Sequence, residues 1–370
     1  MKPKLCIITE TTWWDTDNTV LPNLKDRFQL DIHVISKIGK NKYSEDEIYK
    51  AQKELGINIK VWKRIGRIRN PLNFFLFLKI YRIIKKNDPK NTWINYVYMY
   101  DPYMNFLIIL INKYKKLISV HDYNDHIGMD SFLRNLLKHV IYKRNKIFHF
   151  YSEMELDKFK KDYPAKRAFF TTMPLKDYGE PASFGNIRDR DTKRSFLFFG
   201  TIRHYKGLDL LIKAINQIKR DDYKLLIAGN TNDWDDYKIL IGNNPNIIAD
   251  IGFINNDDIP KYFSNADFLI LPYRTTTQSG PELISLNYNV PIIASNLAGF
   301  KSAINNGVDG FLFEKENVEA LVDVLNETLN MDEESYSKMK KAQYLKVLEY
   351  RGLEKNIGAI YYESLENIKA

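Results

Sequence analysis

Two short turns in the second half of the chain carry residues that could hold an anion. The first, Gly200–Gly207, reads Gly-Thr-Ile-Arg-His-Tyr-Lys-Gly and joins an apolar run to a helix-like segment. A strand-to-helix turn presents unpaired amides and the positive end of a helix dipole, to which Arg203 and Lys206 would add two cations. The turn lacks the Gly-Lys-Ser/Thr ending of a phosphate-binding P-loop. The alternative interpretation is a basic turn that is merely solvated.

The second turn lies within Thr275–Ser285, where Gln-Ser-Gly-Pro-Glu separates a strand-like run from a helix-like run. Small residues at Ser279 and Gly280 let the backbone approach a ligand, and Pro281 and Glu282 favour a helix start. Ser279 and Glu282 also have the spacing of a capping box, in which each side chain satisfies an amide near the other. That interpretation explains Glu282 without any ligand.

Strand-like and helix-like segments alternate along the chain, which predicts parallel sheets with crossover helices. In the first half we expect strands at 5–9, 31–36, 57–62, 93–98, 116–120 and 147–151, and helices at 73–86, 103–115 and 131–142. In the second half we expect strands at 195–199, 224–228, 247–250, 268–272, 291–294 and 311–313, and helices at 207–219, 255–263, 281–288 and 318–329. The fold class is therefore α/β, with two Rossmann-like domains whose strand ends face a central cleft.

The alternation breaks between 173 and 193, where Pro174, Gly179, Pro181 and Gly185 lie close together. Such a stretch is typical of a linker. We therefore predict domains at 1–172 and 194–349, joined by a linker at 173–193. The tail from 335 to 370 has a helical, amphipathic pattern, and we expect its last part, from about 350, to pack back on the first domain.

Several segments of the second half resemble glycosyltransferase family 4, whose members have the GT-B fold. Phe-Phe-Gly-Thr-Ile-Arg-His-Tyr-Lys-Gly resembles the family's Gly-Arg-x-x-x-x-Lys-Gly segment, and the stretch from Gly-Phe-Ile-Asn-Asn to Ile-Leu-Pro-Tyr resembles the segment that leads to the donor loop. Val-Pro-Ile-Ile-Ala-Ser and Gly-Val-Asp-Gly-Phe-Leu-Phe complete the series. The resemblance implies retaining transfer of a sugar from a UDP- or GDP-linked donor to a glycan or lipid-linked hydroxyl. The first domain would bind the acceptor and the second the donor.

Carried over residue by residue, the resemblance implies a catalytic set and a donor-binding set. The catalytic set is Arg203, Lys206 and His121, the last at the end of the strand-like Leu-Ile-Ser-Val. The donor-binding set is Gly200, Thr201, Gly229, Phe253, Thr276, Thr277, Gln278, Ser279, Gly280, Glu282 and Ile284. Members of the family generally need no metal, so we expect no metal and no cofactor other than the donor.

The chain departs from the family pattern at three positions. Thr201 stands where the family usually has Arg, so Arg203 would have to act with Lys206. Thr276 and Ile284 stand where the family has two Glu, as in a branch with Gln-Ser-Gly in the donor loop. The diphosphate would then rest on the amides of residues 278–280. Since Ile284 cannot hold the donor ribose, residues 287 and 288 on the same helix face are candidates. In the first loop, Trp residues 13 and 14 could stack on a sugar or pack in the interior.

The formal net charge of +9 is concentrated in one segment, because residues 60–90 hold ten basic residues and one acid. The same segment holds Trp62, Phe74, Phe75, Phe77 and Tyr81. Basic residues interleaved with aromatics suit an anionic membrane or a nucleic-acid backbone, and the alternative is a solvated helix face. A lipid-linked acceptor would explain the pattern, so we predict an anionic membrane surface at Lys60–Lys90 and no nucleic acid as partner.

No apolar run reaches the roughly 20 residues that span a bilayer, and the N-terminal run is too short for a signal peptide. The single cysteine, Cys6, lies in the first predicted strand and is expected to fill the core. These features predict a cytoplasmic protein, and the basic segment would place it at the inner face of the plasma membrane. The resemblance to family 4 implies a role in surface polysaccharide synthesis of the bacterial type. The alternatives are a GT-B nucleotide-sugar epimerase and a catalytically silent subunit that binds a nucleotide or glycan. A Rossmann dehydrogenase is disfavoured, since no Gly-x-Gly-x-x-Gly follows the first strand.

Overall fold

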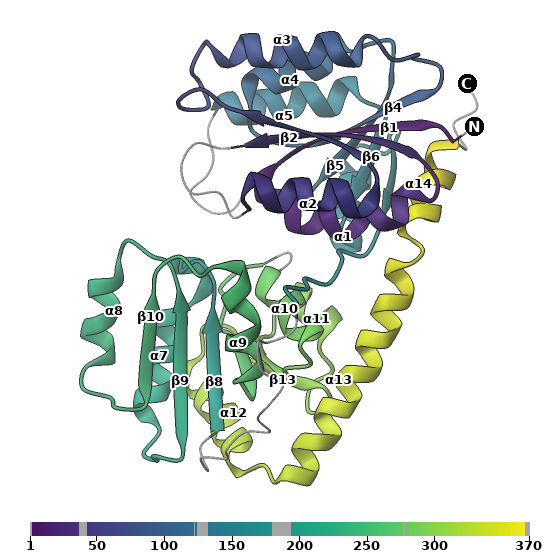
Figure 1. Cartoon of the computed structure of the whole chain (residues 1–370). Coiled ribbons are helices and arrows are strands. Elements are labelled where there is room, and N and C mark those ends of the chain that lie inside the picture. The colour runs from purple at the N-terminus through teal and green to yellow at the C-terminus, as the bar shows by residue number, and fades with distance from the viewer. Residues whose placement is uncertain are drawn as a thin grey trace. The chain divides into compact units, whose positions relative to one another are not determined.

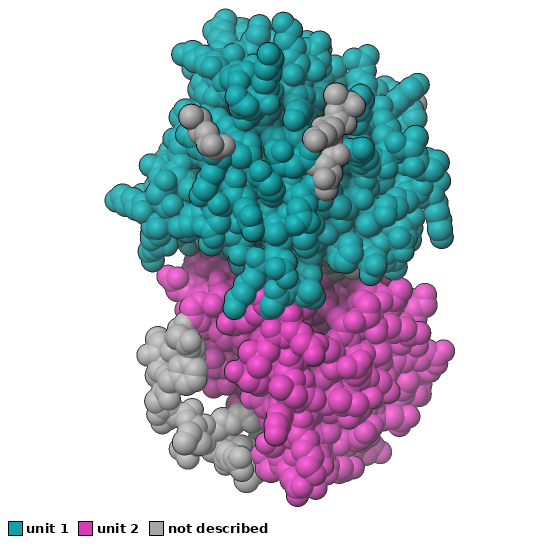
Figure 2. Space-filling model, turned by 90° about the vertical axis from the view of Figure 1, so that its right-hand side faces the viewer, with its two compact units in different colours: residues 1–174, 352–370 teal, residues 175–351 magenta. Residues whose placement is uncertain are grey.

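The computed structural model describes residues 2–36, 43–121, 123, 132–179, 194–276 and 279–366. The chain forms two compact units, which Figure 2 distinguishes by colour. Unit 1 consists of residues 1–174 and 352–370, and unit 2 consists of residues 175–351. Each unit is built on one parallel sheet with helices on both faces (Figure 1). The expected fold class, two Rossmann-like domains with parallel sheets, is confirmed.

The sheet of unit 1 has the strand order β3-β2-β1-β4-β5-β6-β7. Its strands are β1 (Lys4–Glu10), β2 (Gln29–Ser36), β3 (Asn58–Lys63), β4 (Thr92–Val97), β5 (Lys115–Val120), β6 (Ile147–Phe150) and β7 (Arg167–Phe170). The chain runs outward from β1 to β3 and then returns to place β4 on the other side of β1. The carboxyl ends of β1 and β4 are therefore the topological switch point, where open α/β sheets bind ligands.

Helices cover both faces of this sheet, which explains why its strands are almost continuously apolar. They are α1 (Trp14–Lys25), α2 (Glu45–Leu55), α3 (Asn73–Ile84), α4 (Pro102–Leu110), α5 (Phe132–Arg144), α6 (Glu153–Asp162) and α14 (Ile357–Glu366). In Figure 1, α1, α2 and α14 lie on one face and α3, α4 and α5 on the other. Cys6 is completely buried in β1, as expected for a core residue.

The C-terminal helix docks on α1 through a close backbone contact. A Cβ atom on Gly358 would lie 2.2 Å from the carbonyl oxygen of Asn23, so only glycine allows α14 to approach α1 this closely. The Tyr361 hydroxyl is 2.8 Å from Nδ1 of His149, which is fully buried on β6. The last helix of the chain therefore belongs to the first unit.

The sheet of unit 2 has the order β10-β9-β8-β11-β12-β13. Its strands are β8 (Arg194–Phe199), β9 (Tyr223–Gly229), β10 (Ile247–Ile251), β11 (Phe268–Leu271), β12 (Ile292–Ser295) and β13 (Gly310–Phe313). Its helices are α7 (Leu208–Gln217), α8 (Trp234–Ile241), α9 (Ile259–Ser264), α10 (Gly280–Asn287), α11 (Ala298–Ala303), α12 (Val318–Asn330) and α13 (Glu333–Glu354), the last extending three residues beyond the boundary of unit 2. The direction of winding reverses between β8 and β11, so the second switch point lies at their carboxyl ends.

One helix prediction was wrong in length. The helix expected at 103–115 ends at Leu110, because Ile111 leaves the helical conformation and β5 begins at Lys115. The Tyr114 hydroxyl donates to the carbonyl oxygens of Ile84 and Asn87, which holds this residue outside the helix. The helical tail consists of two helices, α13 and α14, with a break at 355–356. Among the described residues, no helix has both the length and the apolar character needed to cross a membrane.

Candidate functional site

The first predicted turn lies at the switch point of unit 2, directly after β8. Gly200 has φ +100° and Gly207 has φ +68°, which are conformations that favour glycine. A Cβ atom on Gly229 would lie 2.0 Å from the carbonyl oxygen of Gly200, and one on Gly207 would lie 1.9 Å from that of Pro272. Glycines at these positions therefore let the ends of β8, β9 and β11 approach one another.

Lys206 lies inside this turn with its ammonium group at the switch point. The side chain is only 7% exposed, and among the described residues its Nζ atom has no hydrogen bond or ion pair. Nζ is 3.3 Å from the point where a Cβ on Gly200 would lie and 5.6 Å from the ring centroid of Tyr273. Burial, together with the charge of Arg203, lowers the pKa of Lys206 to about 8. A buried cation without a counter-ion is the arrangement expected for a group that awaits an anion.

The second predicted turn leads into α10, which begins at Gly280. The Ser279 hydroxyl accepts a hydrogen bond from the backbone N–H of Glu282 at 3.4 Å, so one half of the predicted capping box is present. Among the described contacts, the reciprocal bond from the Glu282 carboxyl group is absent. Burial raises the pKa of Glu282 to about 8, so its carboxyl group is neutral at pH 7. At pH 7 this acid in the first turn of α10 therefore does not cancel the positive end of the helix dipole.

Arg274 fixes the start of the donor loop against the first turn. Its guanidinium group donates to both carboxylate oxygens of Asp209 on α7, at 2.9 and 2.8 Å, and to the carbonyl oxygen of His204 at 2.7 Å. Its backbone N–H donates to the carbonyl oxygen of Tyr205 at 2.7 Å. Arg274 and Asp209 were not predicted, and we assign them a positioning role, because both contact the Lys206 turn. A bidentate Arg–carboxylate pair of this kind specifies geometry.

The two residues proposed to replace the ribose-binding Glu have other contacts. The Asn287 side-chain carbonyl accepts from Arg351 at 2.9 Å. The Tyr288 hydroxyl donates to the carbonyl oxygen of Gly179 at 2.8 Å and accepts from the N–H of Tyr178 at 3.1 Å. Both side chains therefore hold α10 in place, and Ile284 is buried within that helix.

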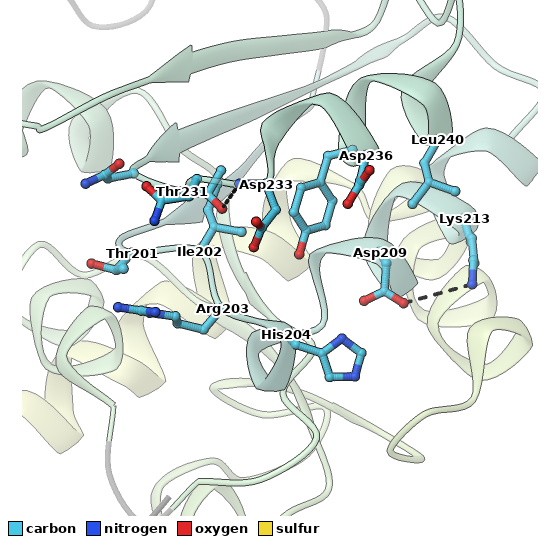
Figure 3. A pocket seen from close by; sticks show the side chains of 13 residues that line it. Thr201, Ile202, Arg203, His204, Asp209, Lys213, Thr231, Asp233, Asp236 and Leu240 are labelled. Atoms are coloured by element: carbon cyan, nitrogen blue, oxygen red, sulfur yellow. Dashed lines mark hydrogen bonds and ion pairs between the residues drawn. The ribbon is translucent and has the colours of Figure 1, made fainter. Parts of the chain in front are cut away.

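A cavity of about 580 Å³ opens beside the first turn. It is lined by Thr201, Ile202, Arg203, His204, Asp209, Lys213, Asn230, Thr231, Asn232, Asp233, Asp236, Tyr237 and Leu240. Figure 3 shows Thr201 and Arg203 on one side and Asp209 with Lys213 on the opposite side. Two of the predicted residues thus line the cavity, whereas Lys206 does not. Phe253 is 42% exposed in the segment after β10, as a residue available to a ligand would be.

The remaining donor-loop residues are placed only in part. Thr276 is half-buried and Ser279 is buried, whereas Thr277 and Gln278 lie outside the described residues. The structure thus brings together Gly200, Lys206, Ser279, Gly280 and Glu282 around one switch point. Among the residues that the sequence interpretation missed, the strongest signal was Arg274, a cation only four residues before Gln278.

His121 follows β5 at the carboxyl edge of the sheet of unit 1. Its ring stacks on that of Trp13 at a centroid distance of 3.8 Å and an interplanar angle of 7°, and on Tyr151 at 4.6 Å. Trp13 therefore orients His121, while Trp14 is buried in the core. Nearby, the Thr9 hydroxyl donates to Asp17 at 2.6 Å, and burial raises the pKa of Asp17 to about 7. Asp17 belongs to an Asp-Thr-Asp sequence that was not among the predicted site residues.

A second polar cluster in unit 1 consists of Cys6, Asp31 and His33 on β1 and β2, with potential ligand atoms within 4.8 Å of one another. Asp31 already pairs with Lys4 at 2.9 Å, and the indole N–H of Trp62 donates to Nδ1 of His33 at 3.0 Å. Burial lowers the pKa of His33 to about 4 and raises that of the Cys6 thiol. A neutral His beside a thiol and a cation-paired carboxylate is a structural arrangement, and we assign it no ligand.

The second half of the chain is similar to glycosyltransferases. Residues 180–346 match the family Glycosyl transferases group 1. An uncharacterized 41.2 kDa protein in the cps region of Klebsiella pneumoniae is 22% identical over 328 residues, which cover 83% of this chain and 85% of that protein. An uncharacterized glycosyltransferase of Methanocaldococcus jannaschii is 26% identical over 139 residues, which cover 37% of this chain and 36% of that protein.

The whole chain is also similar to solved structures. The crystal structure of Anabaena Alr3699/HepE in complex with UDP-glucose has a TM-score of 0.73 at 13% sequence identity, covering 99% of this chain and 100% of that chain. This likeness concerns the fold, and it extends over both units. The family match therefore covers the second half of the chain, and the structural likeness shows the GT-B fold.

Proposed function

We propose that the chain is a retaining glycosyltransferase of the family 4 type. It moves a hexosyl or N-acetylhexosaminyl group from a UDP- or GDP-linked donor to a hydroxyl group of a glycan or lipid-linked acceptor. The observation that carries this proposal is the buried ammonium group of Lys206, which lies beside Gly200 without a counter-ion in the described part of the chain. The group 1 match across residues 180–346 supports the same assignment.

In this reaction the bond from the anomeric carbon to the diphosphate breaks while a bond to the acceptor oxygen forms, and the proton of the acceptor hydroxyl passes to the departing diphosphate. Negative charge builds up on the departing diphosphate, so catalysis rests on cations and amides that are already in place. Lys206 would stabilise that charge directly, Arg203 would add a second cation, and the first amides of α10 would complete the site. Because these groups can carry the charge, we propose a site that needs no metal. In unit 1, His121, which stacks on Trp13, remains the predicted catalytic residue.

Surface polysaccharide synthesis is the pathway that we propose for this activity. The Klebsiella pneumoniae relative, which is similar over 83% of this chain, lies in a cps region according to its name. A lipid-linked acceptor would also supply a reason for a membrane-binding surface.

Nucleotide binding provides the first test. UDP, GDP and their common sugar conjugates are screened by thermal shift, because a ligand at 100 times its Kd stabilises the folded state by about 2.7 kcal/mol. We expect one diphosphate series to raise the melting temperature. The products are then analysed with and without an acceptor glycan. Release of free sugar at the same rate in both cases would indicate an epimerase or hydrolase, and no shift with any nucleotide would contradict the donor site.

We further propose that unit 1 binds anionic membranes through a basic and aromatic surface, defined here as Ile65, Arg67, Arg69, Leu72, Phe74 and Phe75. All six side chains are exposed, the two phenylalanines by 40% and 59%. The sequence interpretation was too broad, because Arg64 and Phe77 are buried and Trp62 bonds to His33. The narrowed surface still combines cations with apolar side chains that can enter the headgroup region.

Liposome sedimentation tests this surface. The wild-type chain should bind vesicles that contain phosphatidylglycerol more than neutral phosphatidylcholine vesicles. The variant Phe74→Ser/Phe75→Ser should lose most of the binding that survives at high salt, because it removes apolar insertion. The variant Arg67→Gln/Arg69→Gln should weaken binding at low salt. As a control, Lys338→Gln changes a well-exposed cation of unit 2 and should bind as the wild type does. Equal binding to both kinds of vesicle would contradict the proposal.

A further inference from the structure

Lys176 lies in a segment expected to be a linker, yet its ammonium group is at the first residue of α10. A Cβ atom built on Gly280 would lie 3.7 Å from Nζ of Lys176 and 3.9 Å from its Cε atom. The side chain is half-buried, and the preceding Leu175 is buried. Both Lys176 and Gly280 belong to unit 2, so this contact lies within one compact unit.

The position of Lys176 is fixed from the other end of the same helix. The backbone N–H of Tyr178 donates to the Tyr288 hydroxyl at 3.1 Å, and that hydroxyl donates to the carbonyl oxygen of Gly179 at 2.8 Å. Tyr288 is the C-terminal cap of α10. The segment 175–179 is therefore attached to α10, and Lys176 reaches the helix N-terminus from a defined backbone.

A second cation, Lys206, also lies close to this helix start. Nζ of Lys206 and Cγ of Pro281 lie 3.3 and 3.5 Å from the point where a Cβ on Gly200 would lie. Lys206 is more than nine-tenths buried, and its ammonium group has no hydrogen bond or ion pair among the described residues. The first two residues of α10, Gly280 and Pro281, are thus each flanked by a lysine.

The buried ammonium group of Lys206 and the positive end of a helix lie close together, and an anion bound between them would stabilise both. The acid in the first turn of α10, Glu282, is buried and does not pair with Lys206 in the described contacts. Lys176 has its ammonium group beside the first residue of the same helix, within reach of an anion bound there. We propose that Lys176 is a further donor-binding residue, which contacts the diphosphate of the nucleotide-sugar together with Lys206. This inference rests on the proposed function, and it adds a cation from outside the motifs that resemble family 4.

The test measures the contribution of the diphosphate to binding separately from that of the nucleoside. Isothermal titration calorimetry gives the Kd of UDP, GDP and inorganic pyrophosphate for the wild type and for Lys176→Met, Lys176→Arg, Lys206→Met and Lys338→Met. We expect Lys176→Met to raise the Kd of the diphosphates about tenfold, the scale of one charge-assisted hydrogen bond. Lys176→Arg should remain within about threefold of the wild type, since it keeps the charge. Lys338→Met, an exposed site on α13, should change nothing.

Uridine and guanosine, which lack phosphate, distinguish a contact with the diphosphate from a purely structural role of Lys176. Their binding should be the same in the wild type and in Lys176→Met. Equal diphosphate affinity in these two proteins, with loss in Lys206→Met, would overturn the role of Lys176 alone. Equal losses for nucleoside and diphosphate would show that Lys176 only supports the fold, which also overturns it. If the wild type binds none of the three anions, the proposed function itself fails.

Discussion

Replacing Lys206 with alanine is expected to lower turnover at least ~100-fold, the usual scale for removal of one preorganised group that stabilises charge in the transition state. The ammonium group is buried at the switch point of unit 2 and has no counter-ion in the described residues. It would therefore interact with the departing diphosphate in a site with little water, where such interactions are strong. The measurement is the initial rate of sugar transfer at saturating donor and acceptor, at pH 7.

The pH dependence separates loss of the charge from loss of the fold. In the free protein the pKa of Lys206 is lowered to about 8 by burial and by Arg203, so the ammonium form predominates below that pH. The Kd of the donor diphosphate should consequently rise as the pH increases above 8, by about tenfold per unit. Glu282 has a pKa of about 8 as well and becomes anionic over the same range. The variant Glu282→Gln removes the contribution of Glu282 to the pH dependence of the Kd and leaves that of Lys206.

Two controls complete this experiment. Lys338→Ala changes an exposed lysine of α13 and should retain wild-type turnover. Lys206→Ala should show a flatter pH profile for diphosphate binding than the wild type does. Near-wild-type turnover in Lys206→Ala would contradict the catalytic assignment, and an unchanged pH profile would contradict the assignment of the titration to this lysine.

The sequence predicted the fold through local patterns that the packed sheets require. Strands buried on both faces must be continuously apolar, so β8 and β11 could be located from their composition. The edge strand β7 was not among the predicted strands, because Arg167–Phe170 is only half-buried and exposed at both ends. The requirement for glycine at position 358 could not be predicted either. It depends on Gly358 meeting the backbone of Asn23, a contact between segments more than 300 residues apart.

The parts of the site that depend on turn glycines and on the N-cap of a helix could be predicted from the sequence. The glycines at 200 and 207 and the cap at Ser279 have local signatures, and the structure places them together at one switch point. Lys176 and Arg274 could not be assigned in the same way. Each acts through a contact that is distant in the sequence, Lys176 with Gly280 and Arg274 with Asp209. Similarly, the count of basic residues in 60–90 did not distinguish the exposed Arg67 from the buried Arg64.

Arg64 holds together the carboxyl ends of three strands in unit 1, and its removal is expected to lower the free energy of unfolding by about 3–5 kcal/mol. Its guanidinium group donates to Glu10 at 2.6 Å and to Asp101 at 2.8 Å, and all three side chains are buried. In Arg64→Met the two carboxylates face each other without a cation. Urea unfolding followed by tryptophan fluorescence measures the loss, because four of the five Trp residues precede residue 175, in unit 1.

The sign of the pH dependence identifies the cause. Burial already raises the pKa of Asp101, and without Arg64 the pKa of Asp101 should rise further. A raised pKa in the folded state contributes stability below the unfolded pKa that is lost as the pH increases, so the variant should lose less stability at pH 5 than at pH 8. A neutral triple variant, Glu10→Gln/Arg64→Met/Asp101→Asn, should recover much of the loss, since the amide of residue 101 can still cap α4. A pH-independent loss in Arg64→Met would instead indicate lost packing, and the Trp13–His121 stack at the same sheet edge would then be the contact to examine.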